Sequence, residues 1–179
     1  MKVLDLFCGL GGFSQAFRDR GHKVVGVDIN PSVKPDIVAD ILTFDTDEYF
    51  DVILASPPCQ EFTKDFLPWH KGNPDLRLVF ATLRIIDKVK PKYWVIENVI
   101  GAVKYFKPIL GNYRLRCGSR YLWGNFPLFK VDHKKCFGKW RMPPSENRPL
   151  IRSKIPYEIS FKLCVAIEQQ NTLEILGES

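Results

Sequence analysis

The 179-residue sequence predicts a single α/β domain, built on a mostly parallel sheet with helices on both faces. Short apolar runs at residues 2–6, 23–27, 52–54 and 93–96 have the composition of buried strands. Segments with helical spacing separate these runs, and the alternation of strand and helix is typical of a parallel sheet. The chain is too short for two domains of ordinary size, so residues 1–179 are expected to form one domain.

A glycine-rich turn follows the first predicted strand. Gly9, Gly11 and Gly12 stand within four residues, and a helix is predicted from Phe13 to Arg20. Glycine permits a tight turn and a close approach of ligand to backbone, and a helix N-terminus suits an anionic group. Asp28 closes the next strand, about twenty residues on, where an acid can hold a ribose. This arrangement predicts a nucleotide-type ligand but does not separate NAD from S-adenosylmethionine.

Residues 36–41 are predicted to form a third strand, with Asp40 at its end. Two interpretations of Asp40 stay open: it accepts a hydrogen bond from an adenine amine, or it caps a helix or turn. Further along, residues 75–88 predict an amphipathic helix, with Leu76, Val79, Phe80, Leu83 and Ile86 at helical spacing.

The last third of the chain is expected to contribute a hairpin and a closing helix. Residues 114–117 and 119–124 predict paired β-strands. Residues 155–170 predict a helix with one apolar face, made of Ile159, Leu163, Cys164 and Ile167.

Two polar stretches at strand ends carry the chemistry. Ser56-Pro57-Pro58-Cys59-Gln60 follows one apolar run, and Glu97-Asn98 follows another. The prolines stop the strand, because each fixes φ and lacks an N–H, so Cys59 emerges at the sheet's carboxyl edge. A lone cysteine is more often an inert buried thiol, but a carboxylate is expected at the same edge. Between them, residues 60–74 predict a long exposed loop whose aromatic residues either contact bases or pin the loop to the body.

Composition excludes several classes of protein. The net charge of +6 leans mildly towards a polyanionic partner. The five cysteines are scattered and odd in number, which argues against a disulfide framework and for a reducing compartment. His133 and Cys136 lack the two further ligands of a structural zinc site, so no metal is expected. No apolar run approaches the roughly 18 residues of a membrane span, and no signal segment is evident, so we predict a cytoplasmic protein.

Three stretches together resemble the cytosine carbon-5 DNA methyltransferase family: Asp5 to Ser14, Pro57 to Gln60, and Glu97 to Val99. The resemblance implies a Rossmann-like, S-adenosylmethionine-dependent methyltransferase fold. It also implies methylation of carbon 5 of cytosine in DNA, with a target base flipped out of the duplex. Cys59 would add to carbon 6 of the ring as a thiolate, while Glu97 holds and protonates ring nitrogen 3.

The remaining site residues are implied by the same resemblance. Asn98 would orient the backbone at the active site, and Arg120 best matches a family arginine that contacts the cytosine. The turn would hold the methionine moiety of S-adenosylmethionine, Asp28 the ribose and Asp40 the adenine. The full set implied for the cofactor is Asp5, Phe7, Cys8, Gly9, Gly11, Gly12, Phe13, Asp28, Ile29, Asp40, Ile41 and Pro57.

The chain departs from the family pattern in its second half. Gly118 stands where an earlier arginine is expected, and Ser153-Lys154-Ile155-Pro156 replaces a Gly-Asn-Ser signature. Residues 125–152 would form only a reduced, basic target-recognition segment, suited to phosphates rather than base edges. These departures leave two alternatives: a tRNA cytosine-5 methyltransferase, or a degenerate S-adenosylmethionine-binding module that assists a partner subunit. A separate specificity subunit would also compensate for the short segment.

Overall fold

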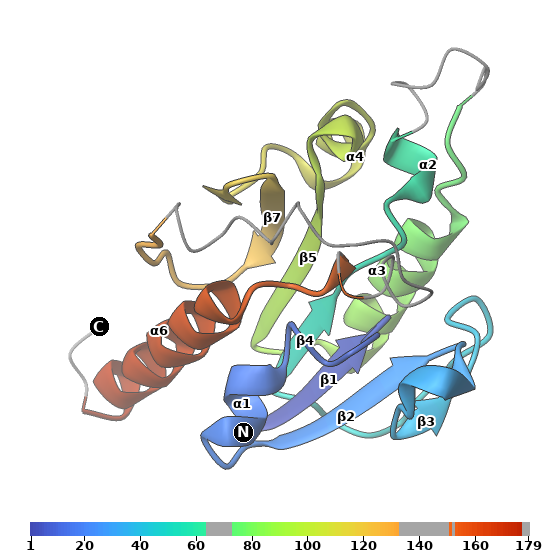
Figure 1. Ribbon diagram of the computed structural model, residues 1–179. Helices are drawn as coiled ribbons and strands as arrows, with labels where there is room; N and C mark the ends of the chain where they lie inside the picture. Colours follow the sequence, from blue (N-terminus) through green and yellow to red (C-terminus); the bar gives the residue numbers. More distant parts are fainter. Residues whose placement is uncertain (64–72, 133–150, 152, 177–179) are drawn as a thin grey trace.

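The computed structural model describes residues 1–63, 73–132, 151 and 153–176. Its centre is a seven-stranded sheet in the order β3-β2-β1-β4-β5-β7-β6 (Figure 1). The strands are β1 (Lys2–Leu6), β2 (Lys23–Asp28), β3 (Ile37–Val38), β4 (Val52–Ala55), β5 (Tyr93–Val99), β6 (Leu115–Cys117) and β7 (Arg120–Asn125). The first five strands in this order run parallel, and β7 and β6 add an antiparallel edge. The predicted mostly parallel sheet and the C-terminal hairpin are confirmed.

Helices cover both faces of this sheet. On one side lie α1 (Gln15–Asp19) and α6 (Tyr157–Leu176), and on the other α3 (Arg77–Val89) (Figure 1). Two short elements, α2 (Gln60–Thr63) and α4 (Val103–Leu110), follow β4 and β5, with the 3-10 turn η3 (Ile100–Ala102) leading into α4. A second 3-10 turn, η1 (Pro31–Val33), connects β2 to β3. No helix in the described part of the chain is both long enough and apolar enough to span a membrane.

Alternation along the strands divides the interior into two cores. Val3, Val52 and Val95 point towards α1 and α6, whereas their neighbours Leu4 and Ile53 point towards α3. All five side chains are fully buried. Successive side chains of a strand face opposite sides of the sheet, so strands that are apolar at every position require cover on both faces.

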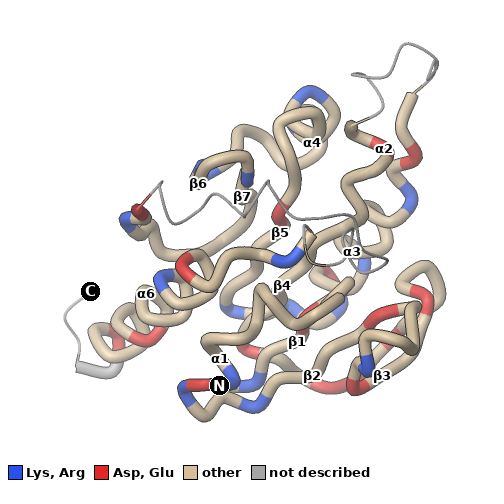
Figure 2. The backbone as a smooth tube through the Cα atoms, in the orientation of Figure 1, with Lys and Arg blue, Asp and Glu red and all other residues tan. Residues whose placement is uncertain are grey.

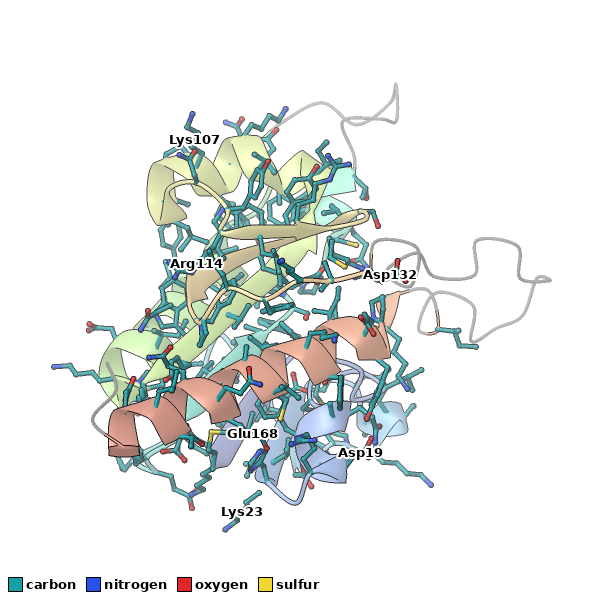
Figure 3. The ribbon with its side chains drawn as sticks, turned by 90° about the vertical axis from the view of Figure 1, so that its left-hand side faces the viewer. Asp19, Lys23, Lys107, Arg114, Asp132 and Glu168 are labelled. Carbon is teal, nitrogen blue, oxygen red and sulfur yellow. The ribbon has the colours of Figure 1, made fainter. Side chains whose placement is uncertain are left out.

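The closing helix α6 is fixed to the start of the chain by packing and by charge. Its predicted apolar face is confirmed, because Ile159, Leu163 and Ile167 are fully buried. Glu168, on the same helix, pairs with Arg20 at 2.6 Å and with His22 at 2.8 Å. Figure 3 shows α6 lying across this face of the molecule, with Glu168 labelled on the helix. These contacts join the last helix to the connection between α1 and β2.

The third strand is shorter than predicted. Only Ile37 and Val38 pair with β2, whereas residues 36–41 were expected to form the strand. The Asp36 carboxylate accepts the backbone N–H of Gly26 at 2.7 Å, in the place where a longer strand would supply a carbonyl oxygen. A side chain therefore completes the edge of the sheet.

Two further expectations are wrong, one about the buried face of a helix and one about where the exposed loop begins. Phe80 is 54% exposed, because α3 buries the face that carries Val79 and Ile85 instead. Phe62 was assigned to an exposed loop, yet it lies in α2 and is buried against Phe106, with ring centroids 5.1 Å apart.

The cysteines differ in part from the expected all-reduced pattern. Cys117 is disulfide-bonded, while Cys8, Cys59 and Cys164 are not in disulfides. The predicted basic segment at 125–152 falls mostly on residues 133–150 and 152, which lie outside the described residues. His133, Cys136 and the loop aromatics Phe66 and Trp69 also lie outside them.

Candidate active site

The predicted site residues follow one edge of the sheet. Asp40 comes after β3, Asp28 ends β2, the glycine turn follows β1, Cys59 follows β4 and Glu97 lies near the end of β5. Because these strands are parallel and adjacent, the strand order places the five positions in that sequence along the carboxyl edge. Residues far apart in the chain therefore come together here.

Glu97 and Arg120 form a buried ion pair at this edge. Arg120 donates from Nη1 to Oε1 of Glu97 at 3.0 Å, and the side chains are 15% and 4% exposed, respectively. In the antiparallel register Glu97 lies opposite Leu122 and Val99 lies opposite Arg120. The charged residues are thus diagonal neighbours on one face, within reach of long side chains.

Burial raises the pKa of the Glu97 carboxyl, and the positive charge and hydrogen bond of Arg120 partly oppose this effect. A raised pKa favours a protonated carboxyl at a pH where an exposed glutamate would be ionised. Such a group can donate a proton to a base placed beside it.

The segment that carries Cys59 is held from the same strand. Asn98 is buried and donates from Nδ2 to the carbonyl oxygen of Pro57 at 2.9 Å. Its Oδ1 accepts the backbone N–H of Val99, which fixes the side-chain amide. Cys59 is half-buried and not disulfide-bonded, and its carbonyl oxygen begins α2 by accepting the N–H groups of Phe62 and Thr63. The side chain of Asn98, on the strand that carries Glu97, therefore holds the segment that carries Cys59.

The glycine turn is closed from two sides. The Asp28 carboxylate accepts the N–H of Gly9 at 2.9 Å and that of Asn30 at 2.9 Å. On the other side, residues that precede α6 cover Gly12, where a Cβ would lie 2.8 Å from the backbone N and O of Ile155. Arg120 also donates to the carbonyl oxygens of Ser153 and Lys154, both at 3.3 Å. The C-terminal segment thus completes the same edge of the sheet.

Two groups beneath the turn have strongly shifted pKa values. Burial raises the pKa of Asp5 to about 7, although the Ser14 hydroxyl donates to its Oδ2 at 2.5 Å. The second oxygen of Asp5, Oδ1, is buried and has no hydrogen-bond partner among the residues that the structure describes. Burial and the nearby acids raise the pKa of the Cys8 thiol to about 12, so it stays protonated.

Some residues of the implied cofactor site are buried in the cores, whereas others are exposed at the sheet edge. Phe13 and Ile41 are only 2% exposed and pack in the two cores, so their side chains belong to the interior. Ile29, in contrast, is 65% exposed beside Asp28. Asp40 accepts the N–H of Leu42 through its side chain, as the turn interpretation predicts, and its carboxylate is only half-buried.

A family model for the C-5 cytosine-specific DNA methylase matches residues 1–108, which is more than half of the chain. The chain belongs to this family. The match includes the glycine turn, the segment with Cys59 and the strand with Glu97. The expected Rossmann-like α/β methyltransferase fold is confirmed, because a solved structure of similar fold is a candidate DNA modification methyltransferase encoded within an E. coli prophage. It has a TM-score of 0.51 at 20% identity, over 80% of this chain and 52% of that one.

The curated relatives of this chain include type II methyltransferases and tRNA (cytosine(38)-C(5))-methyltransferases. It is 32% identical over 121 residues to the type II methyltransferase M.DdeI of Desulfomicrobium norvegicum, covering 56% of this chain and 28% of the relative. It is 30% identical over 142 residues to the mouse tRNA (cytosine(38)-C(5))-methyltransferase, covering 68% and 34%. M.AquIA of Picosynechococcus is 28% identical, with 59% and 51% covered. The chain thus spans between about a quarter and a half of these relatives.

Sequence reasoning assigned no role at the site to three residues that lie beside the predicted site residues. Ser56 lies directly beside Glu97 in the sheet, as the register of β4 and β5 shows. Lys154 and Ile155 cover the glycine turn from the far end of the chain. Ser56 could have been recognised as a polar residue directly after an apolar run. Lys154 and Ile155 stand in the stretch that replaces the Gly-Asn-Ser signature, but no local pattern shows that they pack on the glycine turn.

Proposed function

We propose that this chain is a methyltransferase that uses S-adenosylmethionine to methylate carbon 5 of cytosine in DNA, with Cys59 as the nucleophile. The observation that carries the proposal is the buried Glu97–Arg120 pair on β5 and β7, together with a half-buried cysteine on the segment that follows the neighbouring strand β4. A binding module has no need of both groups, so their survival at one edge favours an enzyme over a degenerate accessory subunit.

The residues of the turn fit S-adenosylmethionine. Nothing lies within 4 Å of the place that a Cβ at Gly11 would take, and its φ of 69° is one that glycine adopts readily, so a ligand can approach the backbone closely at this point of the turn. Asp28 offers a half-buried carboxylate suited to two ribose hydroxyls, with Ile29 exposed beside it, and Asp40 offers a carboxylate beyond. When bound, S-adenosylmethionine would supply an electrophilic methyl group to this edge of the sheet.

The protein's own groups would activate the base. Carbon 5 of cytosine is a poor nucleophile, so the Cys59 thiolate would first form a bond to carbon 6. Glu97 would give its proton to ring nitrogen 3 as this bond forms, which draws the electron pair towards the ring. After carbon 5 is methylated and loses its proton to water, the thiolate leaves as the double bond between carbons 5 and 6 re-forms, and ring nitrogen 3 returns its proton to Glu97. Asn98 would hold the Pro57 carbonyl, and hence the chain that carries the thiol, throughout.

Two nucleic acids remain as substrates. Figure 2 shows Lys and Arg on β6, β7 and α4 and a concentration of Asp and Glu around β3, so phosphates would lie on the β7 side. DNA is proposed because M.DdeI and M.AquIA are type II methyltransferases. The mouse relative's name makes tRNA the alternative. A base flipped out of a duplex or presented by a loop would reach the same thiol, and a cytoplasmic location would suit both substrates.

A methyl-transfer assay decides between these substrates. Purified chain is incubated with tritiated S-adenosylmethionine and duplex DNA, single-stranded DNA or tRNA. We expect most label in duplex DNA, whereas label confined to tRNA would establish the alternative. Bisulfite sequencing of the labelled DNA then measures specificity: a short preference fits the need for a separate specificity subunit. No transfer to any substrate, together with retained binding of S-adenosylhomocysteine, would favour the accessory module.

A covalent trap tests the nucleophile. DNA that contains 5-fluorocytosine should form an adduct that survives denaturation, because fluorine cannot leave as a proton. Cys59→Ser should abolish the adduct. Cys164→Ala is the matched control, since this free thiol lies in the core beneath α6, and it should leave the adduct intact. An adduct that persists in Cys59→Ser would remove Cys59 from the mechanism.

A further inference from the structure

Ser56 occupies a place that neither the family pattern nor the expected chemistry assigns. Ala55 pairs with Ile96 in the parallel register of β4 and β5, so the next residues, Ser56 and Glu97, are neighbours across the two strands. Neighbours in register project from the same face of a sheet. The backbone N–H of Ser56 donates to the carbonyl oxygen of Leu6 at 3.3 Å, which continues the sheet past the end of β4.

The Ser56 hydroxyl is buried and has no hydrogen-bond partner in the described structure. A buried hydroxyl without a partner is costly, and in native proteins such a group calls for a specific explanation. The Glu97 carboxyl lies on the neighbouring strand in register with Ser56, and the hydroxyl lowers the pKa of that carboxyl against the effect of burial. The two facts agree if the hydroxyl completes a full hydrogen bond to Glu97 after a small side-chain rotation.

The Glu97 carboxyl has room for this second donor. Arg120 engages Oε1, and an ionised carboxylate accepts at both oxygens. One bond alone leaves a carboxyl free to swing about that bond. A second donor from the neighbouring strand would fix the plane of the carboxyl relative to the base.

We propose that Ser56 is a positioning residue that donates its hydroxyl to Glu97 and, with Arg120, holds the carboxyl oriented towards the target cytosine. This role rests on the proposed function, in which Glu97 protonates the ring. Ser56 touches neither the cofactor nor the base in this scheme. It also restrains the pKa of Glu97 against the effect of burial, so that the carboxyl releases its proton to the base more readily.

The first test needs no turnover. The Glu97 carboxyl is titrated by carbon-13 NMR in the free protein, with its resonance assigned by loss in Glu97→Gln. We expect Ser56→Ala to shift the Glu97 pKa upward, because a group that stabilises the charged form is lost. Ser56→Thr keeps a hydroxyl and should restore the wild-type value. Ser160→Ala is the matched control: this buried serine lies in α6, and its hydroxyl oxygen accepts the backbone N–H of Ala16.

The second test uses methyl transfer. Ser56→Ala should lower kcat about five- to tenfold, equivalent to one hydrogen bond, and leave KM for S-adenosylmethionine unchanged. The alkaline limb of the pH profile should move to higher pH, since Glu97 then loses its proton later. An unchanged Glu97 pKa in Ser56→Ala, or an equal shift in Ser160→Ala, would overturn the proposal. If the chain transfers no methyl group, the NMR titration still decides the role of Ser56 separately from the proposed function.

Discussion

Replacing Arg120 by methionine should destabilise the protein strongly, and more so at alkaline than at acid pH. The substitution keeps most of the side-chain volume but leaves the Glu97 carboxyl, only 4% exposed, without its buried cation. Removing one partner of such a buried pair costs about 3–5 kcal/mol, which is a large share of the roughly 5–15 kcal/mol that stabilises a typical domain. We expect a loss in this range at pH 8.

The pH dependence follows from the raised pKa of Glu97. In the unfolded chain this carboxyl titrates near its model value of 4.5, and in the folded protein burial moves its pKa higher. Between these two values the folded state holds a proton that the unfolded state has lost, so stability falls as pH rises across the interval. Loss of Arg120 raises the folded pKa further and deepens this fall. The cost of Arg120→Met should therefore be smaller at pH 5, where the buried carboxyl can protonate.

Urea denaturation followed by tryptophan fluorescence at pH 5 and pH 8 measures both costs. Adding Glu97→Gln removes the uncompensated charge and should recover most of the loss at pH 8. Arg116→Met, on the exposed face of the neighbouring strand, is the control and should cost less than about 1 kcal/mol. An equal cost at both pH values, or no recovery in the double variant, would refute the account of the pair.

Three further predictions concern Asp5 and Asp28, which lie beside the glycine turn, and Gly101 in η3. Asp5→Asn should remove a decline in stability of about 1.4 kcal/mol per pH unit between roughly pH 4 and 7, because the folded pKa of about 7 exceeds the unfolded value; parallel denaturation curves for variant and wild type would contradict this. Gly101→Ala places a Cβ 1.9 Å from the backbone oxygen of Phe62 and should lower the free energy of unfolding, measured by calorimetry, by about 1–3 kcal/mol; an unchanged free energy of unfolding would contradict this. Asp28→Ala should weaken S-adenosylhomocysteine binding about 10- to 100-fold in titration calorimetry, by about 1–3 kcal/mol, as ribose contacts are lost; unchanged affinity would remove Asp28 from the cofactor site.

Most of the architecture could be predicted because it depends on local pattern. The buried strands are apolar at nearly every position, and α6 shows its buried face at helical spacing, so both were recognised with their faces. Predictions were wrong where a distant group replaced the local signal. The strand predicted at 36–41 is shorter because the Asp36 side chain, rather than backbone, accepts the N–H of Gly26. Phe62 is buried because it packs against Phe106. Neither contact could be predicted from the residues that are adjacent in the sequence.

The sequence by itself determined the α/β class, the family and the residues that carry the proposed chemistry. Each of these depends on short stretches of residues, such as the prolines before Cys59 and the glycines after β1. Their shared location also followed, since parallel strands end at one edge of a sheet.

Only the tertiary structure decided how these residues are electrostatically tuned. The pairing of β5 with β7 places Arg120 on Glu97, and the register of β4 places Ser56 beside the same carboxyl. The return of the chain before α6 lays Ile155 over Gly12. A pKa depends on burial and on the nearest charges, and both are set by residues that lie more than twenty positions away in the chain. The chemistry of Glu97 is therefore a property of the fold rather than of the residues around it in sequence.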